Sequence, residues 1–137
     1  MQAEGLDGKW RKLRIDRIPV KKEFSQLHIR ARDLFRRLYP CTYFCEELTV
    51  KLDNYITVYM DIFVPDYGVA IETQGKQHKE HIRFFHPSNN HFIRAKKLDA
   101  LKLQWCELNK FELVELLYNE NDDEWERKIR QAIGRSE

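Results

Sequence analysis

Residues 60–73 read MDIFVPDYGVAIET and consist of two apolar runs joined by a short polar turn. Both runs are rich in the β-branched and aromatic residues that favour strands. The proline, aspartate and glycine of residues 65–68 are typical of a tight turn. The stretch therefore predicts two antiparallel strands lying side by side, each carrying one acid, Asp61 or Glu72.

The rest of the chain extends this strand pair into a larger sheet covered by helices. Apolar residues recur at helical spacing over residues 25–38, and Pro40 ends this helix. Residues 42–52 are β-rich and predict a hairpin with residues 55–64 through a two-residue break. The remaining expected elements are a loop at 76–90, a helix at 91–108, a strand at 112–118, and a helix that begins at Asn121 or Asp122 and stops at Gly134. This order predicts an α/β fold, more closely an α+β arrangement with a mixed sheet.

The charge is unevenly distributed along the 137 residues. Residues 1–37 carry a formal charge of +6, residues 38–106 are neutral and residues 107–137 carry −4. We expect residues 1–22 to form a basic N-terminal arm and residues 23–137 a single domain. A basic end indicates a polyanionic partner, most often nucleic acid, although a solvated surface with clustered charge would give the same pattern.

Hydropathy and cysteine content bear on the location of the protein. No run approaches the ~20 apolar residues of a membrane span. Three cysteines cannot form a closed set of disulfides, so a reducing, cytoplasmic compartment is expected. Cys41 and Cys45, with the histidines of residues 78–91, also suggest structural zinc, but their irregular spacing favours small packed side chains.

The two strand acids suggest a metal site. A carboxylate is costly to bury in an apolar strand unless a cation or a donor offsets its charge. Asp61 and Glu72, with a backbone carbonyl between them, would form a hard oxygen site for Mg²⁺, with Mn²⁺ able to substitute. Such an ion activates water and stabilises a phosphodiester under attack. The competing interpretation is that both acids pair with Lys or Arg on an exposed sheet face.

The strand acids resemble the signature of the PD-(D/E)XK nuclease superfamily, an acid on one strand followed by an acid-x-Lys triplet on the next. Here the acid is Asp61 and the triplet is Glu72-Thr73-Gln74. The resemblance implies a restriction-endonuclease-like αβββαβ core, extended here by a C-terminal helix. It also implies that Asp61, Glu72 and the Thr73 carbonyl bind the metal. Gln74 stands where the superfamily has the lysine that orients the attacking water, which leaves room for a weakened or inactive enzyme.

A narrower resemblance, over roughly residues 42–118, is to the very-short-patch repair (Vsr-like) endonucleases and the related EDxHD homing endonucleases often found in phages. Their ordered set of Glu, Asp, a variable metal-site position, His and Asp corresponds here to Glu46 or Glu47, Asp61, Thr73, His78 and Asp99. Residues 75–78 match the Gly-x-x-His of that family, and residues 97–109 resemble its helix, in which an Asp and a Lys precede an Asn. A bacterial or phage-infected cell would fit this family.

The narrower resemblance also implies roles for these residues. His78 would be the general base, and Asp99 would orient it. Lys76 or His78 could replace the missing lysine. One of Glu46 and Glu47 would contact a water or a second metal ion. Strand alternation lets only one of these two face the site, and Glu47 is favoured.

The expected function is that of a Mg²⁺-dependent DNA endonuclease. Basic side chains would hold the phosphates; the candidates are Lys9, Arg11, Lys12, Arg14, Arg17, Lys21, Lys22, Lys76, Arg83, Arg94 and Lys97. A homodimer, or a separate targeting domain or protein, could complete the enzyme. The alternatives are a degenerate nuclease fold that binds nucleic acid or a protein without cutting, a ribonuclease, and a small α/β interaction module.

Overall fold

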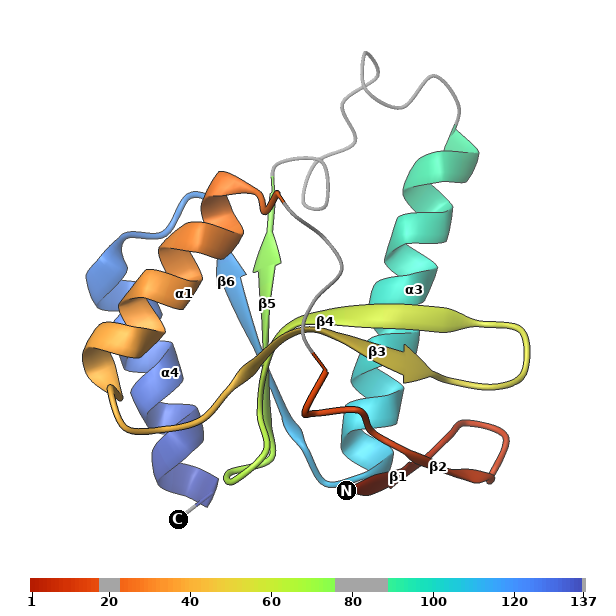
Figure 1. The fold of residues 1–137 in the computed structure, drawn as a ribbon. Helices are drawn as coiled ribbons and strands as arrows, with labels where there is room; N and C mark the ends of the chain where they lie inside the picture. Colours follow the sequence, from red (N-terminus) through yellow and green to blue (C-terminus); the bar gives the residue numbers. More distant parts are fainter. Residues whose placement is uncertain (18–22, 76–88, 137) are drawn as a thin grey trace.

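The computed structural model describes residues 1–17, 23–75 and 89–136, with the backbone alone for residues 89–96 (Figure 1). In chain order the elements are β1 (Gln2–Glu4), β2 (Trp10–Lys12), α1 (Gln26–Leu38), β3 (Cys45–Lys51), β4 (Thr57–Val64), β5 (Val69–Gln74), α3 (Asn89–Leu108), β6 (Glu112–Leu117) and α4 (Asp122–Ser136). From α1 onward, this order of helices and strands is the one that the sequence predicts.

The four longer strands form one sheet in the order β3-β4-β5-β6. Neighbouring strands are antiparallel from β3 to β5, whereas β6 runs parallel to β5, with Val69 opposite Glu112 and Gln74 opposite Leu117. A parallel pair needs a crossover connection, and α3 lies in the chain between these two strands. The described part of the chain is therefore a mixed α+β fold with a four-stranded mixed sheet and three helices.

Two hydrophobic cores cover opposite faces of the sheet. In Figure 1, α1 and α4 lie on one side of β5 and β6, and α3 lies on the other side. The first core contains Phe35 of α1 and Trp125 of α4, and the second contains Trp105 of α3; all three side chains are buried. Each such side chain contributes about 2–3 kcal/mol by leaving water. The two cores hold the helices of both layers against the sheet, and so fix where side chains from these helices can meet side chains of the strands.

The N-terminal segment is folded against the domain where an arm was expected. β1 and β2 pair as an antiparallel hairpin, and Ala3 and Leu13 are buried in the second core. Asn109, at the end of α3, accepts a hydrogen bond from Glu4 N and donates one to Glu4 O. Trp10 of β2, by contrast, is 63% exposed. The basic residues of this segment therefore project from a structured surface, and residues 18–22 lie outside the described residues.

Two connections differ from the sequence prediction. The predicted two-residue break is a longer connection: residues 52–56 lie between β3 and β4, and within it Leu52 N donates to Ile56 O and the Asp53 carboxylate accepts the Ile56 amide. The last helix does not stop at Gly134 but continues to Ser136, since a glycine inside a helix costs only about 1 kcal/mol. Asn121 begins this helix by accepting a hydrogen bond from Glu124 N.

The side-chain alternation of β3 and β4 shifts by one residue at the same level of the sheet. Met60 and Ile62 lie two residues apart yet belong to opposite cores, whereas Cys45 and Leu48 lie three residues apart and share one core. The backbone pairs on either side of the shift are Glu46–Ile62 and Leu48–Met60, and the residues between them, Glu47 and Asp61, are not paired in the ladder. The shift places two acids, Asp61 and Glu47, opposite each other.

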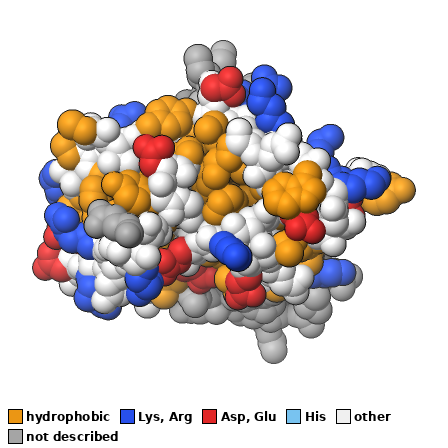
Figure 2. All heavy atoms as spheres, turned by 90° about the horizontal axis from the view of Figure 1, so that it is seen from below, with side chains coloured by type: hydrophobic (Ala, Val, Ile, Leu, Met, Phe, Trp, Pro, Cys, Tyr) orange, Lys and Arg blue, Asp and Glu red, His pale blue; other side chains and the backbone are white. Residues whose placement is uncertain are grey.

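The two chain ends lie at the opposite end of the sheet from the carboxyl ends of β5 and β6 (Figure 1). Figure 2 shows the face near the chain ends from below, with hydrophobic side chains across its middle and both signs of charge around them. The carboxyl ends of β5 and β6 point away from it in Figure 1. The candidate site described next is built at those carboxyl ends.

Candidate functional site

The two strand acids meet where the β4–β5 ladder ends. The last backbone pair is Ile62 with Ile71, and beyond it the carboxylates take over as hydrogen-bond partners. Asp61 N donates to Glu72 Oε2 at 2.9 Å, while Thr73 N and Oγ1 donate to Asp61 Oδ2 at 2.9 and 3.0 Å. The structure thus brings Asp61 and Glu72 side by side and fixes both against the backbone.

Lys102 of α3 reaches the same point from the second core. Its Nζ donates to Glu72 Oε1 at 2.5 Å, and the Glu72 side chain is only 5% exposed. Burial and the neighbouring Asp61 raise the pKa of Glu72 to about 8, although Lys102 acts in the opposite direction. Burial disfavours the Lys102 ammonium, but the surrounding carboxylates outweigh it and raise its pKa. Lys102 therefore faces two neighbouring carboxyl groups, Glu72 and Asp61, and the ammonium stabilises the ionised form of both.

His28 of α1 approaches Asp61 from the other core. Its ring is stacked on Phe24 and is 2% exposed. Its Nε2 lies 2.9 Å from Glu46 Oε2, and its Nδ1 lies 3.8 Å from Asp61 Oδ1. The second distance is too long for a hydrogen bond. Burial opposes the charged imidazole, but the two carboxylates outweigh it and raise the pKa of His28.

The carboxyl group of Asp61 keeps its charge in this setting. Burial alone would favour the neutral acid, but the facing His28 and the hydrogen bonds from Thr73 outweigh burial and lower the pKa of Asp61. An ionised Asp61 beside a Glu72 that resists ionisation is the kind of divergent pair found at functional sites.

Both Glu46 and Glu47 lie at the site, which corrects the expectation that only one could face it. Glu47 has a φ of 52°, in the left-handed region that a non-glycine residue rarely adopts. This turn of the backbone breaks the strand alternation, so Glu46 meets His28 while Glu47 also contributes to the site. One ligand atom each from His28, Glu47 and Asp61 all lie within 4.8 Å of one another. Glu46 is further held by Arg32, whose Nη1 lies 3.4 Å from Oε2.

Four other residues belong to the expected motif: Thr73, Gln74, Asp99 and His78. Thr73 N and Oγ1 face the Asp61 carboxylate, and the metal-binding role of the Thr73 carbonyl stays a prediction. Gln74 is buried, and its Oε1 has no hydrogen-bond partner among the residues that the structure describes. Asp99 is half-buried on α3, close enough to Lys102 to raise its pKa. His78 lies outside the described residues.

The candidate phosphate contacts are only partly available. Lys9, Lys12, Arg14, Arg17 and Lys97 are exposed. Arg11 is engaged within the hairpin, where it pairs with Asp7 at 2.7 Å and also donates to Asn54. The remaining candidates, Lys21, Lys22, Lys76, Arg83 and the Arg94 side chain, lie outside the described residues.

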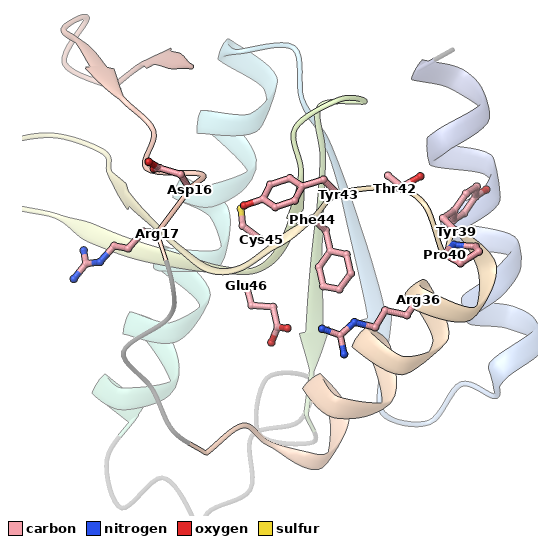
Figure 3. Close-up of a pocket in the computed structure, with 10 residues that line it drawn as sticks. All are labelled: Asp16, Arg17, Arg36, Tyr39, Pro40, Thr42, Tyr43, Phe44, Cys45 and Glu46. Atoms are coloured by element: carbon pink, nitrogen blue, oxygen red, sulfur yellow. The ribbon is translucent and has the colours of Figure 1, made fainter.

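An open groove lies along the start of β3, and Glu46 is one of the residues that line it (Figure 3). Arg17 and Arg36 lie at its two sides, and Tyr43 and Phe44 lie between them. The Tyr43 hydroxyl donates to the Ile15 carbonyl, which joins the segment after β2 to this wall. Glu46 lines the groove and is also the partner of His28. The groove therefore combines two cations and two aromatic rings with Glu46, the residue that it shares with the site.

Sequence reasoning missed His28 and gave Lys102 no role. His28 occupies the apolar stripe of α1, three residues before Ala31 and seven before Phe35, so a titratable residue on that stripe was a usable signal. Lys102 belongs to the Asp-and-Lys helix pattern, but its contact with Glu72 depends on how α3 crosses the sheet.

Comparisons with known proteins add no relative: no protein-family model, curated protein or solved structure matches the chain. None of the helices in the described ranges is long and apolar enough to cross a membrane.

Among the described residues, His28, Glu47 and Asp61 form a group that could hold a metal ion. Two further acids are linked to this group, Glu46 through His28 and Glu72 through the amide of Asp61, and burial and Asp61 both disfavour the ionised form of Glu72. Carboxylate oxygens are the ligands that Mg²⁺ and Mn²⁺ take in proteins. A cation at this point would offset the repulsion between the neighbouring carboxylates and the cost of burying their charge.

Proposed function

We propose that the chain is a metal-dependent endonuclease of the PD-(D/E)XK superfamily, related to the Vsr-like and EDxHD enzymes, which hydrolyses phosphodiester bonds in DNA. The element order α1-β3-β4-β5-α3-β6 is that of the restriction-endonuclease-like core, and α4 is the additional helix. The mixed sheet with its parallel last strand also supports this proposal.

One observation carries the proposal: Lys102 donates to Glu72, whose other oxygen accepts the amide of Asp61. The superfamily places two acids and a lysine at this level of the sheet, and Gln74 occupies the lysine position. A lysine from α3 supplies the same charge from a different element. An acid–acid–lysine set is therefore present in space although the sequence motif lacks its third member.

The chain's own groups can be assigned roles in hydrolysis. Asp61 and Glu72 would hold the metal with the Thr73 carbonyl. A bound divalent ion supplies positive charge to the phosphodiester under attack and lowers the pKa of a bound water. Lys102 favours the ionised form of Glu72 against burial and Asp61, and its ammonium could orient a water or a phosphate oxygen. His78 stays the predicted general base.

The groove beside Glu46 supports nucleic acid as the substrate. Guanidinium groups bind phosphate oxygens well, and aromatic rings stack on bases of an unpaired strand. Arg17, Arg36 and the exposed ring of Tyr43 offer both kinds of contact in the groove that Glu46 also lines. The exposed lysines and arginines of residues 9–17 add sequence-independent attraction, which makes binding strongly salt-dependent.

The second candidate function is binding without cleavage, and Gln74 is the observation that favours it. A buried glutamine in place of a charged residue is what a degenerate site would show. Under this alternative, the groove and the basic segment would still hold nucleic acid, whereas Lys102 would serve only to balance Glu72.

A cleavage survey tests the proposal. The chain is incubated with supercoiled plasmid, single-stranded DNA and RNA, each with Mg²⁺, with Mn²⁺ and with a chelator. We expect metal-dependent nicking or linearisation of plasmid. RNA cleavage alone would make the chain a ribonuclease, and tight salt-sensitive binding without any cleavage would favour the binding module. A His78→Ala variant that cuts at the normal rate would remove His78 as the base.

A further inference from the structure

On the side that faces α1, Asp61 lies next to His28, which has no part in the proposed metal site of Asp61, Glu72 and the Thr73 carbonyl. Asp61 Oδ2 is occupied by Thr73, while Oδ1 faces Nδ1 of His28 at 3.8 Å. This nitrogen is buried and has no hydrogen-bond partner within the described ranges. A buried ring nitrogen left unpaired beside a carboxylate requires an explanation, because such groups are almost always satisfied.

Glu46 determines which nitrogen of His28 is free. Its carboxylate can only accept when ionised, so the ring nitrogen that it contacts, Nε2, carries the proton. In a neutral ring the lone pair is then on Nδ1 and points toward Asp61. Arg32 holds Glu46 in place, and Phe24 fixes the plane of the ring. A carboxylate that orients a histidine so that its other nitrogen is free is the arrangement found behind metal-binding histidines.

Glu47 adds a third donor at an energetic cost. Its φ of 52° costs on the order of 1 kcal/mol or more for a residue with a side chain. Backbone strain of this kind persists where the surrounding structure demands the side-chain position. The result is one ligand atom each from His28, Glu47 and Asp61 within 4.8 Å. Two atoms bound to one ion at about 2.1 Å lie at most about 4.2 Å apart, so the 3.8 Å between Nδ1 and Oδ1 already lies within that span.

We propose that His28, Glu47 and Asp61 form a cation site with a nitrogen donor, which prefers a first-row transition ion such as Mn²⁺ to Mg²⁺, and that Glu46 is its positioning residue. The inference rests on Asp61 as a metal ligand, as in the proposed function. Imidazole nitrogen suits transition ions, whereas Mg²⁺ takes oxygen donors and keeps its waters. One nitrogen in the donor set is therefore enough to separate the two ions.

Metal binding without nucleic acid tests this inference. Titration calorimetry measures the affinity for Mn²⁺ and for Mg²⁺, and pulsed electron paramagnetic resonance of the Mn²⁺ complex detects ¹⁴N nuclei bonded to the metal. We expect Mn²⁺ to bind at least about tenfold more tightly than Mg²⁺, with a ¹⁴N coupling in the wild type that is absent in His28→Asn. Glu46→Gln should weaken Mn²⁺ binding about 10–100-fold, and Asp66→Asn, in the exposed β4–β5 turn, is the matched control.

Two results would overturn the inference: equal affinity for the two ions, or a ¹⁴N coupling that is missing in the wild type or persists in His28→Asn. Should His28→Asn fail to fold, the ion preference and coupling of the wild type and the effect of Glu46→Gln still decide the matter. A chain that binds Mn²⁺ through His28 but cuts nothing would keep this inference and lose the proposed function. A chain that cuts with Mg²⁺ and shows no nitrogen coupling would do the reverse.

Discussion

Replacing Lys102 with methionine removes the one charge that the described structure sets directly against Glu72. Methionine preserves the length and the apolar stem of the side chain, so the packing of α3 changes little. Breaking a buried ion pair costs about 3–5 kcal/mol, because the remaining charge stays buried without a partner. Lys102 is 19% exposed and Glu72 can take up a proton, so we expect a smaller loss of about 2–3 kcal/mol in the free energy of unfolding.

Thermal unfolding of the metal-free protein measures this loss. For a chain of this length about 4 °C corresponds to 1 kcal/mol, so the melting temperature should fall by about 8–12 °C. The control is Lys128→Met, which removes a Lys–Glu contact of 2.8 Å with Glu120. The pKa of Glu120 is lowered, because its hydrogen bonds and Lys128 outweigh burial. Among the described residues, no second carboxylate opposes the ionisation of Glu120 as Asp61 opposes that of Glu72. Losing the Lys128–Glu120 pair should therefore lower the free energy of unfolding by about 1 kcal/mol or less.

A double-mutant cycle separates charge from packing. Adding Glu72→Gln to Lys102→Met removes the buried carboxyl group that has lost its cation, so most of the lost stability should return, with a coupling of about 2 kcal/mol. Mn²⁺ should also raise the melting temperature of Lys102→Met more than that of the wild type. A melting temperature of Lys102→Met within about 3 °C of the wild type, or no recovery in the double variant, would refute the charge argument.

Three further predictions concern other parts of the molecule. Burial raises the pKa of Cys45 to about 11 and of Cys106 to about 12, so at pH 8 only the exposed Cys41 should react with iodoacetamide, and mass spectrometry should count one label in the native state and three after unfolding. Asn109→Ala removes the two hydrogen bonds that hold β1 and should lower the free energy of unfolding by about 1–3 kcal/mol, with faster amide exchange in β1–β2 but not in α4; unchanged exchange would contradict this role. Glu47→Gly relieves the positive φ and should raise the melting temperature of the metal-free protein by a few degrees while weakening Mn²⁺ binding; destabilisation would show that no strain is stored there.

Much of the architecture could be predicted because its elements carry strong periodic signals. The apolar stripe of α1, the β-rich runs of β3 and β4 and the turn at residues 65–68 each indicate their element without tertiary information. The hairpin β1–β2 gave no such signal, since strands of three residues bury only single side chains such as Ala3. Gly134 was misleading, because a glycine near a chain end can remain helical at small cost.

The candidate site was predictable only in its strand residues. Asp61 and Glu72 follow from two apolar strands joined by a tight turn, and the antiparallel pairing brings them together. Glu46 and Glu47 could not both be placed, because alternation holds for a regular strand and no sequence rule expects a glutamate with positive φ. His28 and Lys102 come from helices on opposite faces of the sheet, so their meeting with the acids depends on packing, which local sequence does not encode.

The central claim is that Asp61 holds the metal for phosphodiester hydrolysis. Its most direct test compares the rates at which the wild type, Asp61→Asn and Asp66→Asn nick supercoiled plasmid at saturating Mn²⁺. We predict that Asp61→Asn loses at least about 100-fold in rate, since the metal supplies several kcal/mol of charge stabilisation, and that Asp66→Asn cuts like the wild type. Equal rates for Asp61→Asn and the wild type would contradict the account.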